Sequence, residues 1–185
     1  MIIETGRFGQ LTVGDDEKVT IPQGILGFPE YKHFCLVDPG DDTLIVWLQC
    51  LDHPEIAFPL LEPKIFKPDY AARLSAAELR ELKLENVNQS AVFSILTIPE
   101  DISKMTANLK APLVINLKER LAKQVVLQEN EYTIKSEMFK ELRAHLITIS
   151  SQSRAGLSAR EEHPQSAAIP IRNIPPSLTV KSLAL

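Results

Sequence analysis

The sequence predicts an all-β, mainly antiparallel fold: a small β-barrel-like domain with one or two short helices and a flexible C-terminal tail. Short runs rich in β-branched and aromatic residues recur about every ten residues, up to about residue 135. Turn-forming clusters such as Gly14-Asp15-Asp16 and Pro39-Gly40-Asp41-Asp42 separate these runs. A well-marked helical pattern interrupts the strands once, so alternating βαβ units are not expected and a barrel or sandwich is favoured.

The first half of the chain reads as a series of strands joined by turns. The first two runs flank Gly14-Asp15-Asp16, which predicts that they form a hairpin with each other. His53-Pro54 marks a break before the last strand of this half. The predicted strands are 10–13, 19–21, 34–38, 43–51 and 55–61.

A helix is predicted next, and its start is well marked. Ser75 can act as the N-cap, and Glu78 lies three residues later, as in a capping box. Leu79 and Leu82 give the helix an apolar side, and Asn86 is the expected stop.

Strands then resume, and a second helix follows them. The predicted strands are 91–98, 112–116, 124–128 and 132–135, the last closing a hairpin across Glu129-Asn130. Met138, Leu142 and Leu146 recur every four residues, which predicts a helix over about 136–146.

Beyond Ile149 the composition changes. Polar residues and recurring prolines predict a flexible tail over residues 150–185, outside a folded domain of residues 1–149. The end of this tail is less polar, with apolar residues from Ile169 to Leu185 that could dock in a groove, add a strand to a sheet edge or remain loose.

Composition and charge are typical of a globular protein. The 185 residues carry a formal net charge of −4, which argues against nucleic acid as the main partner because such binding depends on Lys and Arg neutralising phosphates. Cys35 and Cys50 lie in apolar stretches, which favours buried free thiols over a disulfide.

No run approaches the roughly 20 apolar residues of a membrane span, and the first residues lack a signal-peptide pattern. The sequence therefore predicts a cytoplasmic protein.

The motifs of catalysis, cofactor binding and metal binding are missing from the sequence. Its four histidines are far apart, and no Cys-x-x-Cys, G-x-S-x-G or Walker motif is present. Asp52-His53 is the one adjacent acid–imidazole pair, and a surface turn is the simpler interpretation of it. We therefore expect no enzyme, cofactor or metal site. The alternative function is a nucleic-acid-binding small β-barrel, although the aromatic residues lie in runs that resemble core rather than stacking platforms.

An ordered set of short motifs resembles the FliW family of flagellar assembly factors. The resemblance covers roughly residues 2 to 135 and is most specific in Met105-Thr106-Ala107-Asn108-Leu109-Lys110-Ala111-Pro112. Its other parts are Phe8-Gly9, Ile21-Pro22-Gln23-Gly24-Ile25-Leu26-Gly27-Phe28, Trp47-Leu48-Gln49, Ile56-Ala57-Phe58, Glu62-Pro63, Tyr70, Val114-Ile115-Asn116 and Gln124-Val125-Val126.

The resemblance implies a non-enzymatic β-barrel-like protein that binds flagellin and CsrA, the small dimeric RNA-binding repressor of flagellin translation. Flagellin would occupy the protein when it accumulates, and its export would free the protein to remove CsrA from the message. This mechanism needs linked binding equilibria rather than catalysis. CsrA is regarded in the family as inhibited from outside its RNA-binding surface, so no direct contact with nucleic acid is implied.

Six residues are candidates for contact with partners. Glu100 and Asp101 are acidic residues at a turn beside the most specific motif, where a basic partner could bind. Met105, Thr106 and Asn108 belong to that motif, and Asn108 could equally cap local backbone groups. Phe28 could be a core residue or an exposed anchor. These assignments come from charge and position, not from a family motif.

Overall fold

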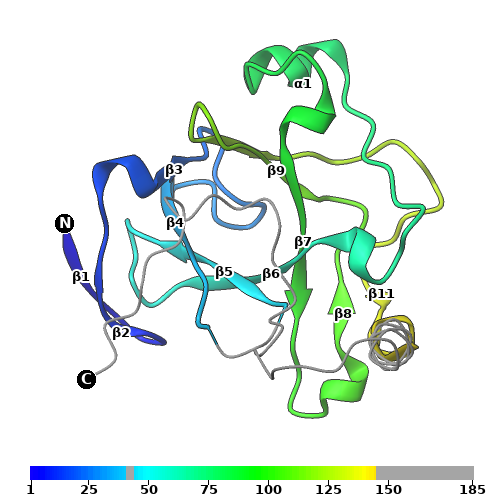
Figure 1. The fold of residues 1–185 in the computed structure, drawn as a ribbon, viewed down its shortest axis with the longest axis horizontal. Helices are drawn as coiled ribbons and strands as arrows, with labels where there is room; N and C mark the ends of the chain where they lie inside the picture. Colours follow the sequence, from blue (N-terminus) through cyan, green and yellow to red (C-terminus); the bar gives the residue numbers. More distant parts are fainter. Residues whose placement is uncertain (41–43, 145–185) are drawn as a thin grey trace, which may run out of the picture.

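A computed structural model describes residues 1–40 and 44–144 of the chain (Figure 1). The predicted tail at 150–185 and the end of the predicted second helix lie outside these residues. Within them, the fold is mostly β, as predicted: a seven-stranded mixed barrel with extra strands and short helices around it.

The barrel closes because β7 pairs with β6 on one side and with β9 on the other. Six of its seven neighbouring pairs are antiparallel, and the pair of β10 with β3 is parallel. The backbone N–H of Thr20 donates to the carbonyl of Arg120 at 2.8 Å beside this parallel contact. The barrel strands are β3 (Lys18–Thr20), β4 (His33–Val37), β5 (Val46–Cys50), β6 (Ala57–Leu61), β7 (Ala91–Thr97), β9 (Leu113–Asn116) and β10 (Leu121–Gln124).

Two short strands extend the sheet from the end of β7. β8 (Thr106–Ala107) pairs with β7, and β11 (Ser136–Glu137) pairs with β8. Thr97, Thr106 and Glu137 therefore stand opposite one another across three strands. β7 is the strand that holds the most partners in the described chain: β6, β8 and β9.

The N-terminal hairpin explains why β4 and β5 are apolar on both faces. β1 (Ile2–Thr5) and β2 (Gly9–Thr12) pair with each other and cover the outside of the barrel. Phe34 and Leu36 of β4 point into the barrel core, whereas Cys35 and Val37 pack under the hairpin. Strands buried on both faces read as continuous apolar runs rather than alternating ones.

The predicted hairpin between 10–13 and 19–21 is wrong. β2 pairs with β1, a strand that the sequence analysis missed, and β3 pairs with β4. The expected turn residues instead form a short 3₁₀ helix, η1 (Asp15–Glu17), in which the Glu17 carboxylate accepts the backbone N–H of Gly14 at 2.7 Å. Three-dimensional packing of the hairpin on the barrel outweighed the local turn signal.

The first helix, α1 (Ala76–Glu81), begins as predicted. The Ser75 hydroxyl accepts the backbone N–H of Glu78 at 3.3 Å, and the Glu78 carboxylate accepts that of Ser75 at 2.7 Å. The helix ends at Glu81 rather than near Asn86, because Lys83 adopts a left-handed conformation (φ 52°) that turns the chain and buries Leu84. Asn86 instead caps a second 3₁₀ helix, η3 (Val87–Gln89).

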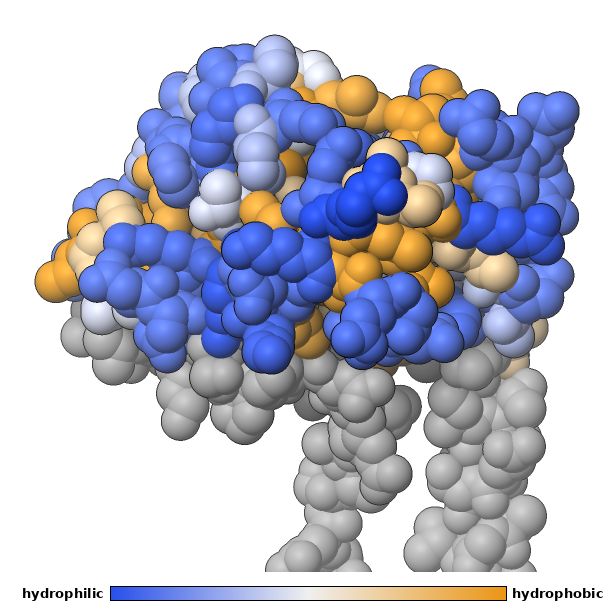
Figure 2. All heavy atoms as spheres, turned by 90° about the horizontal axis from the view of Figure 1, so that it is seen from above, coloured by the Kyte–Doolittle hydropathy of each residue, from blue (hydrophilic) through white to orange (hydrophobic). Residues whose placement is uncertain are grey.

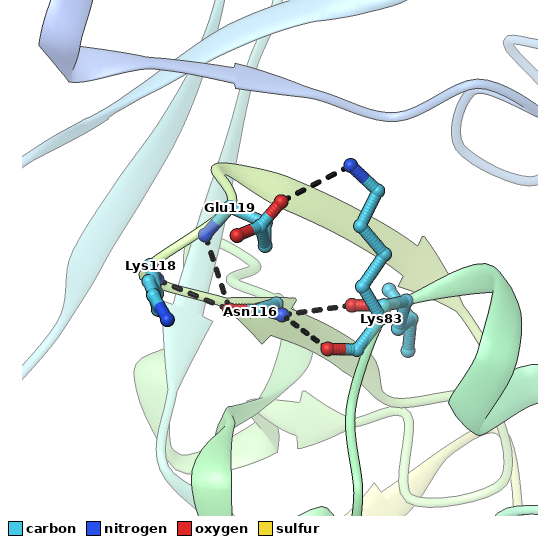
Figure 3. A network of polar contacts seen from close by, with 5 residues as sticks. Lys83, Asn116, Lys118 and Glu119 are labelled. Atoms are coloured by element: carbon cyan, nitrogen blue, oxygen red, sulfur yellow. Dashed lines mark hydrogen bonds and ion pairs between the residues drawn. The ribbon is translucent and has the colours of Figure 1, made fainter.

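Asn116 joins the end of α1 to the barrel (Figure 3). It is 4% exposed, and its amide donates to the carbonyls of Leu82 and Lys83 at 2.8 and 3.2 Å. Its side-chain oxygen accepts the backbone N–H groups of Lys118 and Glu119 at 3.1 and 3.2 Å. One side chain therefore satisfies carbonyls that the helix leaves free and N–H groups of the β9–β10 turn.

The predictions after β9 are only partly correct. The strand expected at 124–128 lies at Leu121–Gln124, and residues 132–135 form no strand. Val125 and Leu127 are nevertheless buried, and their N–H groups bond the carbonyls of Pro112 and Lys110 at 2.9 Å. Tyr132 packs against Tyr70, with ring centroids 4.7 Å apart. The predicted second helix begins at residue 139 rather than 136, because residues 136–137 pair as β11 instead. It is described as far as residue 144.

Two of the predictions on single residues are confirmed. Cys35 and Cys50 are buried free thiols. Trp47, in a run that resembled core, is 9% exposed and lies under the hairpin, where the Arg7 guanidinium stacks 3.6 Å from its ring centroid.

Candidate partner-binding surface

The segment that connects β7 to β8 contains the acidic candidates. It forms a 3₁₀ turn, η4 (Ile102–Lys104), at the lower end of β7 in Figure 1. The Asp101 carboxylate caps this turn by accepting the hydroxyl and the backbone N–H of Ser103 at 2.6 and 3.2 Å. The bond from the Ser103 hydroxyl lowers the pKa of Asp101, so this side chain stays ionised. We call residues 98–104 the η4 ridge.

Apolar and acidic side chains stand side by side on the η4 ridge. Ile98 is 39% exposed and Ile102 is 59% exposed, which is high for isoleucine. Glu100 is exposed and forms no ion pair within the described residues, whereas Asp101 faces the Lys104 ammonium at 3.4 Å. Two exposed isoleucines with two carboxylates between them in the chain are suited to a partner with apolar and basic groups.

The other predicted residues of this segment are partly structural. Met105 is 8% exposed and belongs to the core, and Thr106 is half-buried in β8. The Asn108 side-chain oxygen accepts the backbone N–H of Ala111 at 2.9 Å, so the local capping role is the one observed. Glu100 and Asp101 are therefore the members of the predicted set that face solvent here.

Phe28 lies in a separate aromatic cluster. It is half-buried, with its ring 5.3 Å from that of Phe58 on β6 and 6.3 Å from that of Tyr31. Within the described residues, its ring contacts do not include the η4 ridge. Phe28 is thus neither a fully buried core residue nor an isolated anchor.

Sequence reasoning missed Ile98 and Ile102 as surface residues. Ile98 was included at the end of a predicted strand, and Ile102 was not singled out. The signal available was the Pro99-Glu100-Asp101 cluster between them, since a turn there ends the strand before Ile98 and carries both isoleucines out of the sheet.

The contact of Asp52 with an imidazole is structural. Asp52 pairs with His33 rather than with its neighbour His53: His33 Nδ1 lies 2.8 Å from the Asp52 carboxylate. That carboxylate also accepts the backbone N–H groups of Lys32 and His33. The nearby Cys50 accepts the backbone N–H of His53, and burial raises its pKa, which keeps the thiol neutral. This arrangement ties β4 to the β5–β6 loop and contains no activated nucleophile.

The cavity and the possible metal ligands of the described residues do not add a candidate binding site. A small cavity of about 30 Å³ lies beside the Glu81–Lys123 ion pair, which joins α1 to β10 at 2.7 Å. The described ranges contain no group of three or more His, Cys, Asp or Glu residues that could hold a metal ion. Over the same ranges, no helix is long and apolar enough to cross a membrane.

The face seen from above in Figure 2 has apolar surface in several areas, each bounded by hydrophilic side chains. This face is the one on the side of α1 in Figure 1. On this face the apolar surface is therefore divided by polar side chains rather than continuous.

Comparison with known proteins gives a consistent result. A family model described as FliW protein matches residues 2–138. A flagellar assembly factor FliW from Bdellovibrio bacteriovorus is 43% identical over 147 residues, covering 80% of this chain and 84% of that protein. One from Thermoanaerobacter pseudethanolicus is 37% identical over 144 residues, covering 77% and 96%.

A solved structure agrees with these relatives. The crystal structure of a flagellar assembly factor FliW superposes with a TM-score of 0.71 at 34% identity. The match covers 75% of this chain and 97% of that one. The similarity therefore spans the barrel and its surrounding strands and stops before the C-terminal extension.

Proposed function

This chain belongs to the FliW family, and from that premise we propose that it binds flagellin and a CsrA-type translational regulator in the cytoplasm and so controls flagellin synthesis. Membership makes it a flagellar assembly factor rather than an enzyme. The observation that carries the proposal is the family match over residues 2–138, supported by relatives that share more than a third of their residues with it.

The proposed mechanism is a switch between partners. Flagellin and the regulator bind the same protein with opposing effects, so the level of free flagellin sets how much regulator is held. Such linkage requires two binding surfaces and a difference in affinity between states, and no chemical step.

The η4 ridge is the proposed contact for the regulator. Its support is the exposed Ile98 and Ile102 next to the Glu100 carboxylate, which forms no ion pair with any described residue. This arrangement suits a basic partner with an apolar anchor. Phe28 and its aromatic neighbours form a second, half-buried cluster. This cluster is the proposed contact for flagellin, because flagellin need not share the regulator's charge.

The switch is tested by titration calorimetry of this protein against the regulator, repeated after saturation with flagellin. Regulator binding that flagellin abolishes supports the proposal. If the protein binds flagellin but not the regulator, the part of the proposal that concerns control of translation fails. If it binds neither partner at micromolar concentration, the whole proposal fails. A labelled RNA titrated under the same conditions serves as control, because salt-dependent binding of RNA would favour the nucleic-acid-binding alternative.

Substitutions on the ridge test the proposed surface. Glu100→Lys and Ile102→Asp are each expected to weaken regulator binding about tenfold, by charge repulsion and by loss of an apolar anchor. Glu131→Lys makes the same charge change at another exposed position and serves as the matched control. Equal affinities for Glu100→Lys and the control would move the contact elsewhere.

A further inference from the structure

The chain continues well beyond the barrel, and its last part has a distinct composition. Residues 169–185 contain seven Ile, Leu and Val residues, with Arg172 and Lys181 and no acidic residue. Leu178 and Val180 alternate with Thr179 and Lys181, the pattern of an extended segment with one apolar face. This segment is itself a basic, apolar ligand, the chemistry that suits the η4 ridge.

The described structure brings the start of this extension close to the ridge. Glu137 of β11 stands opposite Thr106 of β8, and Thr106 stands opposite Thr97, the residue before Ile98. Since neighbouring strands are about 4.8 Å apart, Glu137 lies on the order of 10 Å from the base of the ridge. The helical residues 139–144 follow directly, and the chain continues from there.

Charge and exposure on the two sides are complementary. Glu100 and Glu137 are both exposed, and neither forms an ion pair within the described residues. Ile98 and Ile102, on either side of Glu100 in the chain, are 39% and 59% exposed within the described residues. Arg172 and Lys181 could pair with the two carboxylates while Leu178 and Val180 cover the isoleucines.

The connecting chain is long enough for this contact. Residues 145–168 would span about 27 Å as a flexible chain, more than the distance required. A tether of this length holds the segment at an effective concentration on the order of 1 mM, so even a contact with a weak intrinsic affinity would be occupied.

We propose that residues 169–185 bind back onto the η4 ridge and compete there with the CsrA-type regulator. This inference rests on the proposed function for the identity of the competitor, whereas the intramolecular contact can be tested without any partner. The extension would then lower the protein's apparent affinity for the regulator in proportion to the fraction of molecules whose ridge is left free.

The contact is tested first, by NMR on the full chain with a spin label at Ser182→Cys. The methyl signals of Ile98 and Ile102 are expected to broaden, while that of Ile2, which is 66% exposed on the N-terminal hairpin, is not. The wild-type chain treated with the same label controls for reaction at Cys35 and Cys50. Equal broadening at all three methyls, or none, overturns the contact. The sample is then diluted with an excess of chain that carries neither the spin label nor the isotope label. If the broadening disappears, it arises from contact between two copies, and the intramolecular contact is overturned.

The competition is tested next, by calorimetry of the regulator against full-length variants. The double variant Leu178→Asp/Val180→Asp is expected to bind the regulator about tenfold more tightly than the wild type, because the ridge is freed. Ser177→Asp/Thr179→Asp adds the same charges but keeps the apolar face, and is expected to change the affinity much less. An unchanged affinity in the first variant overturns the competition. If no variant binds the regulator, the proposed function fails, while the methyl signals still decide the intramolecular contact.

Discussion

Asn116 is the residue on which the junction between α1 and the barrel depends. Its buried amide serves two carbonyls and two N–H groups from segments more than 30 positions apart in the chain. A polar residue in this position stabilises because all of its hydrogen-bonding groups are paired.

We predict that Asn116→Ala lowers the free energy of unfolding by about 2–4 kcal/mol, because one buried and three partly buried backbone groups lose their hydrogen-bond partner. Urea denaturation measures this loss. Asn88→Ala, at an exposed position on η3, is the control and is expected to stay within about 0.5 kcal/mol of the wild type. Similar losses in both variants would mean that the network contributes little.

Cys35 gives a prediction that depends on pH. Burial raises the pKa of its thiol from 9.0 to about 12, so at pH 8 the reactive thiolate is about a thousandfold scarcer than in an ordinary cysteine. We expect Ellman's reagent to leave Cys35 unmodified in the folded protein and to react with it after denaturation. Rapid modification of the native protein would contradict the burial under the hairpin.

The same shift affects stability. A thiol whose pKa is higher in the folded than in the unfolded state contributes stability that is complete below about pH 9 and is lost as the pH rises toward 12. Unfolding experiments above pH 9 should therefore show a decline to which Cys35 contributes.

At the scale of elements, glycine-dependent turns decide how the strands are joined. Gly24 has a φ of 69° in the turn that runs from β3 to the aromatic cluster of Phe28. A Cβ atom there would overlap the Phe28 carbonyl oxygen and lie 2.8 Å from Pro29 Cα. Both the backbone conformation and the close approach require glycine.

We predict that Gly24→Ala destabilises the protein more than Gly9→Ala does. Gly9 also has a left-handed φ, 62°, but a Cβ there meets nothing within 4 Å. The control should therefore cost about 1–2 kcal/mol for conformation alone, and Gly24→Ala at least about 1–3 kcal/mol more for the overlap. Thermal unfolding of the two variants measures the difference, and equal melting temperatures would show that the turn can shift to make room.

For the whole molecule, the pairing of β7 with β9 closes the barrel with described residues alone. The division into a domain at 1–149 and a tail at 150–185 stays a prediction. Its test is a chain ending at Ile149.

We expect that truncated chain to keep a cooperative unfolding transition within about 5 °C of the full chain, because removal of a weakly held segment costs on the order of 1 kcal/mol. Circular dichroism on heating measures it. A much larger loss would place part of the extension in the core.

Sequence by itself determined the features that depend on local chemistry. The capping box of Ser75 and Glu78, the strands of the barrel from β4 to β9 and the burial of both cysteines followed from side-chain type and spacing. The position of Glu100 and Asp101 on a surface turn followed in the same way. These signals are short in range and need no knowledge of which strands meet.

Tertiary structure alone decided which strands pair and which side chains stay exposed. β2 pairs with β1 rather than β3, because packing of the hairpin on the barrel outweighs the local turn signal. α1 stops at Glu81, where Asn116 from the distant strand β9 accommodates the carbonyls at its end. Met105 is core and Ile102 is surface for the same reason, although both are apolar residues of one segment. Burial depends on contacts between residues far apart in the chain, and local sequence patterns do not specify those contacts.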